Sequence, residues 1–237
     1  MRTVRAVAWK EIQIYFSSPT AYIVGMIFLA MTGFFFVSDL RSPYPEASLS
    51  SFFQGATFVM IFLAPVLTMR LLAEEQKLGT IELLLTSPVR DWEVVVGKYL
   101  ASFVFLVATV SLTVYYIILL VIFADPDPGP IYSGYLGLTL YGAAALSIGM
   151  LTSTLTSNQI VAAVVAMGIL VVLFITDFAA GTLQGLASTI VSEIGLKSHF
   201  DDFERGVIDT KHVVYYVIFT AFFLFLSIRV LESRRWR

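Results

Sequence analysis

The stretch Val94–Phe123, VVVGKYLASFVFLVATVSLTVYYIILLVIF, decides the fold class, because Lys98 is its only charged residue. A membrane-spanning helix needs about 20 predominantly apolar residues, so this run is long enough to cross a bilayer. Runs of the same character recur at 20–38, 52–69, 131–155, 159–178 and 213–230. We therefore predict an all-α integral membrane protein, in which residues 1–237 form a single domain of six transmembrane helices.

The composition of the 237-residue chain fits this prediction. Hydrophobic residues make up 58% of it and charged residues 14%, whereas soluble chains have about 25% charged residues. The absence of cysteine excludes a disulfide scaffold, a thiolate metal site and a cysteine nucleophile. A net charge of -2 does not favour nucleic acid as a partner. Because the first run starts near Thr20 and is long enough to span, we expect no cleaved signal peptide.

Lys and Arg are distributed unevenly between the two sides of the predicted bundle. If both termini are cytoplasmic, the outer side holds Arg41, Lys197, Arg205 and Lys211, and the other 11 of the 15 lie inside. Cytoplasmic loops carry the excess of Lys and Arg in membrane proteins. We therefore predict a multi-pass protein of a prokaryotic cell membrane with both termini in the cytoplasm. The inner residues are Arg2, Arg5, Lys10, Arg70, Lys77, Arg90, Lys98, Arg229, Arg234, Arg235 and Arg237.

The segment 1–18 before the first run has the pattern of a helix that lies on the inner leaflet. Arg2, Arg5 and Lys10 fall mostly off its apolar face, although Glu11 interrupts that face. A disordered basic leader is the alternative. The residues of the apolar face are Val4, Val7, Ala8, Ile12 and Tyr15.

The segment 179–211, between the fifth and sixth runs, is expected to form a short re-entrant hairpin on the outer face. Its part Ala179–Ile194 is apolar but short, and a span there would move the Arg-rich tail to the outside. Irregular backbone at that depth must be shielded by protein or line a wet cavity. Six polar residues follow, which could hold a divalent cation. We favour a solvated acidic rim and predict no metal site: His199, Asp201, Asp202, Glu204, Asp209 and His212.

The loop 70–93, RLLAEEQKLGTIELLLTSPVRDWE, is the longest predicted cytoplasmic loop. Its first part, Arg70–Leu78, favours a helix that ends at Gly79. Thr80–Leu85 favours a second short helix, with Thr80 as its cap. Asp91 is expected to cap the third span, where Glu93 lies in the first turn. Lys98 is expected to extend its ammonium group to the membrane interface.

The second short helix carries an apolar cluster between charged flanks. It is too short to span a membrane, and the loop has no domain of its own in which to bury the cluster. Exposed apolar clusters usually mark an interaction surface. The alternative is that the cluster folds back on the bundle or dips into lipid. Its members are Ile81, Leu83, Leu84 and Leu85.

This loop resembles the first cytoplasmic loop of ABC-2 type transporter permeases, in particular the group that includes the gliding-motility permeases. The resemblance also includes Lys10–Glu11, Ser17–Pro19 and the segment His199–Thr210, and it covers the whole chain. The residues of the loop that carry it are Arg70, Glu74, Glu75, Gly79, Thr80, Glu82, Leu84, Thr86, Pro88, Gly97 and Lys98.

The resemblance implies the membrane-spanning permease subunit of an ATP-binding cassette exporter. Two permease protomers, identical or related, would form the translocation pathway and pair through their first and fifth spans. Separate nucleotide-binding ATPase subunits would bind ATP and Mg²⁺, so this chain would need no cofactor of its own. The loop would carry the coupling helix. The residues expected to contact the ATPase subunit are Glu74, Glu75, Gly79, Thr80, Ile81, Glu82, Leu83, Leu84, Leu85, Thr86 and Pro88.

Missing motifs support a transport protein that is not itself an enzyme. The sequence holds no G-x-x-x-x-G-K-[ST] phosphate loop and no catalytic constellation at membrane depth, so we expect no ATP hydrolysis by this chain. The alternative function is a secondary transporter or channel subunit that ATP does not power. Such proteins carry ionisable residues inside their spans, and these runs are nearly free of charge. The sequence does not indicate the cargo.

Overall fold

The computed structural model describes residues 2–41, 48–80, 89–180 and 193–234, and these residues form helices and connecting turns without a strand. The longer helices are α1 (Arg2–Ser17), α2 (Pro19–Leu40), α3 (Ser50–Thr68), α6 (Asp91–Leu112), α7 (Val114–Phe123), α8 (Pro128–Leu155), α9 (Gln159–Ala180) and α12 (Thr210–Arg234). Two short helices, α4 (Ala73–Lys77) and α11 (Asp201–Glu204), lie in the connections.

Six helical segments of the described chain are long and apolar enough to cross a membrane, which confirms the predicted fold class. They are Pro19–Leu40, Ser50–Lys77, Asp91–Phe123, Pro128–Leu155, Gln159–Thr176 and Thr210–Ser233. The third is not one continuous helix, because α6 ends at Leu112 and α7 begins at Val114. Between them the Thr113 hydroxyl bonds to the Val110 carbonyl at 2.6 Å and to the Tyr135 hydroxyl at 3.0 Å.

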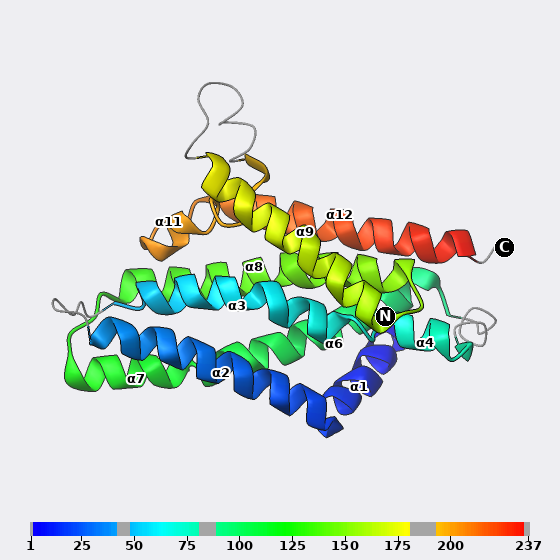
Figure 1. Cartoon of the computed structure of the whole chain (residues 1–237), viewed down its shortest axis with the longest axis horizontal. Coiled ribbons are helices and arrows are strands. Elements are labelled where there is room, and N and C mark those ends of the chain that lie inside the picture. The colour runs from blue at the N-terminus through cyan, green and yellow to red at the C-terminus, as the bar shows by residue number, and fades with distance from the viewer. Residues whose placement is uncertain (1, 42–47, 81–88, 181–192, 235–237) are drawn as a thin grey trace.

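Helices α3 and α8 form the centre of the bundle, and α12 lies at its periphery (Figure 1). In the segments that contain α3 and α8, 72% of the most apolar 18-residue stretch is buried inside the protein. In the segment that contains α12, the buried share is only 11%. Ala145, Gly149 and Ser153 form a ridge of small, buried residues on α8. A Cβ atom at Gly149 would overlap the Thr68 hydroxyl, so the ridge lets α3 and α8 approach closely, as its spacing predicts.

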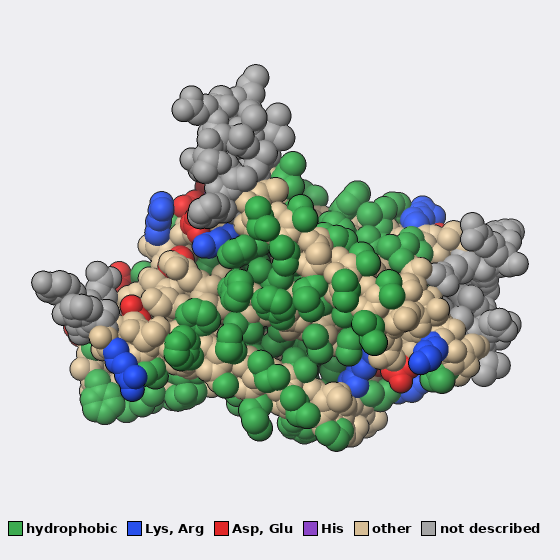
Figure 2. All heavy atoms as spheres, in the orientation of Figure 1, with side chains coloured by type: hydrophobic (Ala, Val, Ile, Leu, Met, Phe, Trp, Pro, Cys, Tyr) green, Lys and Arg blue, Asp and Glu red, His purple; other side chains and the backbone are tan. Residues whose placement is uncertain are grey.

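Charged side chains gather at the two ends of the bundle (Figure 2). Hydrophobic side chains cover the visible middle of the molecule, as expected for a surface that faces lipid. The N-terminus, the end of α12 and α4 lie toward one end, here called the α4 end (Figure 1). The end of α7, the start of α8 and α11 lie toward the other, the α11 end. Six spans require this placement of the two termini on one side.

The first helix, α1, packs against α6 with the face that the sequence identifies as apolar. Ala8 and Tyr15 are buried on this face, and Val7 lies against Gly97 of α6. The apolar stripe therefore packs on protein, and the placement of α1 on the inner leaflet stays a prediction. Trp9 and Phe16 are exposed on the remaining surface of α1 instead.

The predicted outer hairpin falls largely on residues 181–192, which lie outside the described residues. The connection resumes at Glu193 and continues through α11 to α12. Gly206 has a positive φ of 89° and lies against Pro130, where the connection passes the start of α8.

Candidate functional site

The short helix α4 begins the predicted coupling loop and is fixed to α8 through Ser153. The Ser153 hydroxyl accepts hydrogen bonds from the backbone N–H groups of Leu72 at 3.0 Å and Ala73 at 3.1 Å. It donates to the Met69 carbonyl at 3.1 Å. All three groups belong to the turn in which α3 gives way to α4. One buried side chain therefore satisfies backbone groups that the change of direction leaves unpaired.

A second side chain, Gln76, strengthens the link between α4 and α8. Its amide nitrogen donates to the carbonyls of Ser153 at 3.3 Å and Thr154 at 3.0 Å, at the end of α8. Gln76 is therefore a structural contact. On the same helix, Lys77 is exposed.

A buried ion-pair cluster joins α4, α1 and α6. The Lys98 ammonium group lies 2.9 Å from a carboxylate oxygen of Glu75 and 2.5 Å from one of Glu11. Lys98 is 2% exposed and Glu11 is 8% exposed. The expectation that Lys98 extends to the membrane interface is therefore wrong, because two carboxylates hold its ammonium group inside the protein.

This cluster explains the interruption of the apolar stripe of α1. Glu11 occupies a buried position on the face that packs against α6, where an isolated charge would be costly. The ammonium group of Lys98 compensates that charge. One residue before Lys98, a Cβ at Gly97 would lie 2.9 Å from a methyl carbon of Val7. Glycine therefore brings the two helices close enough for the ion pair to form.

The structure places only part of the predicted ATPase-contacting residues. Glu74 is exposed, whereas Glu75 belongs to the buried cluster. Gly79 has a φ of 70°, the left-handed conformation typical of a residue that ends a helix. The Thr80 hydroxyl bonds to the Glu75 carbonyl at 3.3 Å. The predicted contacts that lie outside the described residues are Ile81, Glu82, Leu83, Leu84, Leu85, Thr86 and Pro88.

The start of α6 differs by one residue from the prediction. Asp91 is the first residue of the helix, and Arg90 occupies the cap position. The Glu93 carboxylate accepts a hydrogen bond from the Arg90 N–H at 3.2 Å. This bond satisfies a backbone donor at the helix start, and the negative charge also suits the helix dipole there.

A pocket of about 190 Å³ lies beside α4, where α1, α2, α3 and α9 come together. Arg70 lies over the Tyr15 ring at 4.7 Å and donates to the Ser18 hydroxyl at 3.1 Å. Tyr15 in turn donates to the Leu67 carbonyl, which fixes α1 to α3. Arg70 and Glu74 both line the pocket, so a cation and a carboxylate lie beside its apolar walls. The lining includes Tyr15, Ala21, Val24, Leu67, Arg70 and Gln159.

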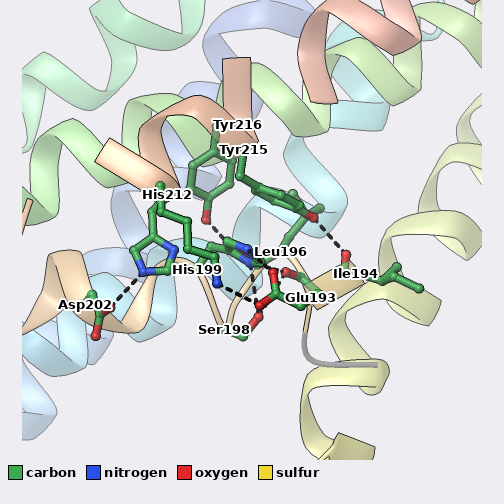
Figure 3. Close-up of polar contacts among 11 residues, drawn as sticks. Glu193, Ile194, Leu196, Ser198, His199, Asp202, His212, Tyr215 and Tyr216 are labelled. Carbon is green, nitrogen blue, oxygen red and sulfur yellow. Dashed lines mark hydrogen bonds and ion pairs between the residues drawn. The ribbon is translucent and has the colours of Figure 1, made fainter. Parts of the chain in front are cut away.

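At the α11 end, both histidines of the chain stabilise the connection into α12 (Figure 3). The His199 ring stacks on Tyr215 at 3.7 Å, and its Nδ1 lies 3.0 Å from the Gly195 carbonyl. His212 Nε2 lies 2.8 Å from a carboxylate oxygen of Asp202. Tyr216 donates to the Leu196 carbonyl. These contacts connect the 193–204 segment to the first turns of α12.

The acidic residues of this region do not converge on one point. Among the described residues, no group of three or more His, Asp or Glu side chains could hold a metal ion. Glu204 accepts a hydrogen bond from the Gln54 amide, while an Asp209 oxygen accepts one from the Lys211 N–H. Burial raises the pKa of Glu204 and lowers the pKa of His199, because burial disfavours the charged form of each group. The hydrogen bond from Lys211 lowers the pKa of Glu193.

Sequence reasoning missed the roles of Lys98, Glu11 and Ser153. A signal for the first two was present, since a carboxylate interrupted an apolar helical stripe and a lysine interrupted an apolar span. Buried charges in proteins are normally paired, so each anomaly pointed to the other. The sequence offers no comparable signal for Ser153, although its hydroxyl fixes the α3–α4 turn.

Comparison with known proteins supports a transport role. Residues 5–195 match the model of a family described as ABC-2 family transporter protein. A protein of Escherichia coli (strain K12) named "Probable multidrug ABC transporter permease YbhR" is 30% identical over 94 residues. The same protein from Escherichia coli O157:H7 gives the same values. The aligned part is 40% of this chain and 25% of each relative, so the chain matches about a quarter of the length of these curated proteins.

Proposed function

We propose that this chain, which belongs to the ABC-2 family of transporter proteins, is the membrane-spanning permease subunit of an ATP-binding cassette exporter. A separate ATPase subunit would bind ATP and Mg²⁺ and drive the transport. The α4 end would face the cytoplasm, where most of the Lys and Arg residues of the connections gather. The chain itself would catalyse no reaction.

The observation that carries this proposal is the rigid attachment of α4 to the rest of the bundle. Hydrogen bonds to Ser153 and from Gln76 fix α4 to α8, and an ion pair with Lys98 joins it to α6. The chain then continues into the apolar sequence TIELLL at 80–85. A segment that receives force from a partner needs such a fixed base, since a loose connection would absorb the movement.

We further propose that two permease chains pair to complete the translocation pathway. Helices α2 and α9 expose large apolar side chains, among them Met26, Phe34, Val164 and Val172. These helices contain the first and fifth spans, through which members of the family are expected to pair. Because the matched relative is named a probable multidrug permease, drugs are the first class of cargo to test.

Leu84→Asp tests the docking of the ATPase subunit. Burial of one leucine in a partner groove contributes about 1.5–3 kcal/mol, and a buried unpaired carboxylate would oppose docking further. The tagged chain is purified from membranes of its native host, and ATP hydrolysis is measured in the eluate. We expect Leu84→Asp to lose most of the hydrolysis that co-purifies with the wild type, while the amount of chain in the membrane stays the same.

Lys77→Ala is the matched control, because Lys77 is an exposed residue of α4 whose loss removes no described contact. It should retain the co-purifying hydrolysis. If Leu84→Asp also retains it, the apolar cluster does not dock an ATPase. It then faces lipid or the bundle.

A further inference from the structure

We propose that Lys98 is a positioning residue that joins α1, α4 and α6 into one mechanical unit. A movement of the coupling loop would then reach the first and third spans together. This inference rests on the proposed function for the origin of the movement. The linkage itself rests on the described side chains and can be tested without any partner.

The geometry gives Lys98 one partner on each neighbouring helix. Its ammonium group contacts Glu11 of α1 and Glu75 of α4, while its own backbone belongs to α6. The side chain of Lys98 is 3% exposed, that of Glu11 11% and that of Glu75 21%. Water therefore has little access, and salt screens such a pair less than it screens an exposed one.

The covalent connection from α1 to α2 links the Lys98 cluster to a fourth helix. Only Ser18 separates the end of α1 from the start of α2, so a displacement of α1 is passed on to the first span. Contact with α6 is extensive for α1, whereas its contact with α2 is slight. The first helix should therefore follow α6 and pull on α2, since its side-chain packing is with α6.

Buried ion pairs such as those of Lys98 contribute little net stability to a fold. Two carboxylates face one ammonium group, and the second carboxylate oxygen of Glu75 is buried without a hydrogen-bond partner in the described structure. Replacing buried ion pairs by apolar residues is often neutral or stabilising. An arrangement that costs solvation in this way fits a need for a specific connection between helices.

The first test measures backbone hydrogen exchange in the purified chain alone. Glu75→Gln removes the negative charge by which α4 attracts Lys98 and so weakens this link, although the amide oxygen still accepts a hydrogen bond, and it leaves the Lys98–Glu11 pair electrically neutral and intact. Exchange in residues 71–79 should then rise by about tenfold or more, the order expected from loss of a partly buried pair. Exchange in α1 should stay unchanged.

Two variants complete this test. Glu11→Gln should produce the reverse pattern, with faster exchange in α1 and unchanged exchange in α4. Glu74→Gln is the matched control, since Glu74 neighbours Glu75 but is exposed. It should leave both segments unchanged. Equal exchange in wild type and Glu75→Gln would overturn the proposal, because the hydrogen bonds to Ser153 and from Gln76 would then hold α4 without Lys98.

The second test measures the ATP-dependent change of exchange in α1 in the complex with the ATPase subunit. We expect this change in wild type and in the exposed-residue control Lys77→Ala, and its loss in Glu75→Gln and Glu11→Gln. A purely structural role would leave the ATP-dependent difference in place. Retention of the full response in both cluster variants would contradict the proposal. If no ATPase binds, the proposed function fails, and the first test still decides whether Lys98 joins the helices.

Discussion

Ser153→Ala removes the hydroxyl that fixes the turn between α3 and α4. The substitution keeps the volume of the side chain but leaves the N–H groups of Leu72 and Ala73 without their acceptor. Both residues are fully buried, so water does not easily replace the hydroxyl. An unsatisfied buried donor costs about 1–3 kcal/mol, so two donors cost about 2–6 kcal/mol. We expect the free energy of unfolding to fall by this amount.

The assay is a titration of the purified chain in mixed micelles with a denaturing detergent, followed by circular dichroism. Ser147→Ala is the matched control, because Ser147 is equally buried in α8 but its hydroxyl bonds only to the Ala144 carbonyl of its own helix. The control should change the free energy by less than about 1 kcal/mol, since the carbonyl keeps its helical partner. An equal loss in both variants would refute the role assigned to Ser153.

Two further predictions concern topology and pH. An impermeant maleimide added outside intact cells should label Asp125→Cys but not Ser233→Cys, in a chain without native cysteine. Labelling of Ser233→Cys would reverse the proposed orientation. Burial lowers the pKa of His199, so below about pH 6.5 the unfolded state binds more protons than the folded state does. The folded segment therefore loses stability as the pH falls through this range. Hydrogen exchange in 193–206, corrected for its intrinsic pH dependence, should therefore be faster at pH 5.5 than at pH 7.5. His199→Asn should lose most of this dependence, and an unchanged dependence would show that another group titrates.

The six spans could be predicted from sequence because bilayer thickness imposes a minimum length on each apolar run. The break at Thr113 could not, since the hydroxyl that marks it bonds to Tyr135 of another helix. The ridge of small residues on α8 was predictable, because Ala145, Gly149 and Ser153 recur every four residues. The residue that packs against Gly149, Thr68, was not predictable from the sequence. Hydropathy gives the length of each helix but not the neighbour against which it packs.

The local features of the candidate site were predictable from the sequence, but its contacts between distant residues were not. The turn at Gly79 follows from local chemistry, because glycine readily adopts the positive φ found there. The cluster of Lys98, Glu11 and Glu75 depends on residues far apart in the chain. Each of the three residues looks like a membrane-interface charge when taken alone. Only their placement on three packed helices reveals that they are partners.

ATP hydrolysis by the purified chain, measured with and without its partner ATPase, tests the proposed permease role most directly. We predict only background hydrolysis by the isolated chain, because its sequence contains no phosphate loop. Activity should appear with the partner and vanish when the phosphate-loop lysine of the partner is replaced. Robust hydrolysis by the isolated chain would contradict its assignment as a permease subunit that a separate ATPase drives.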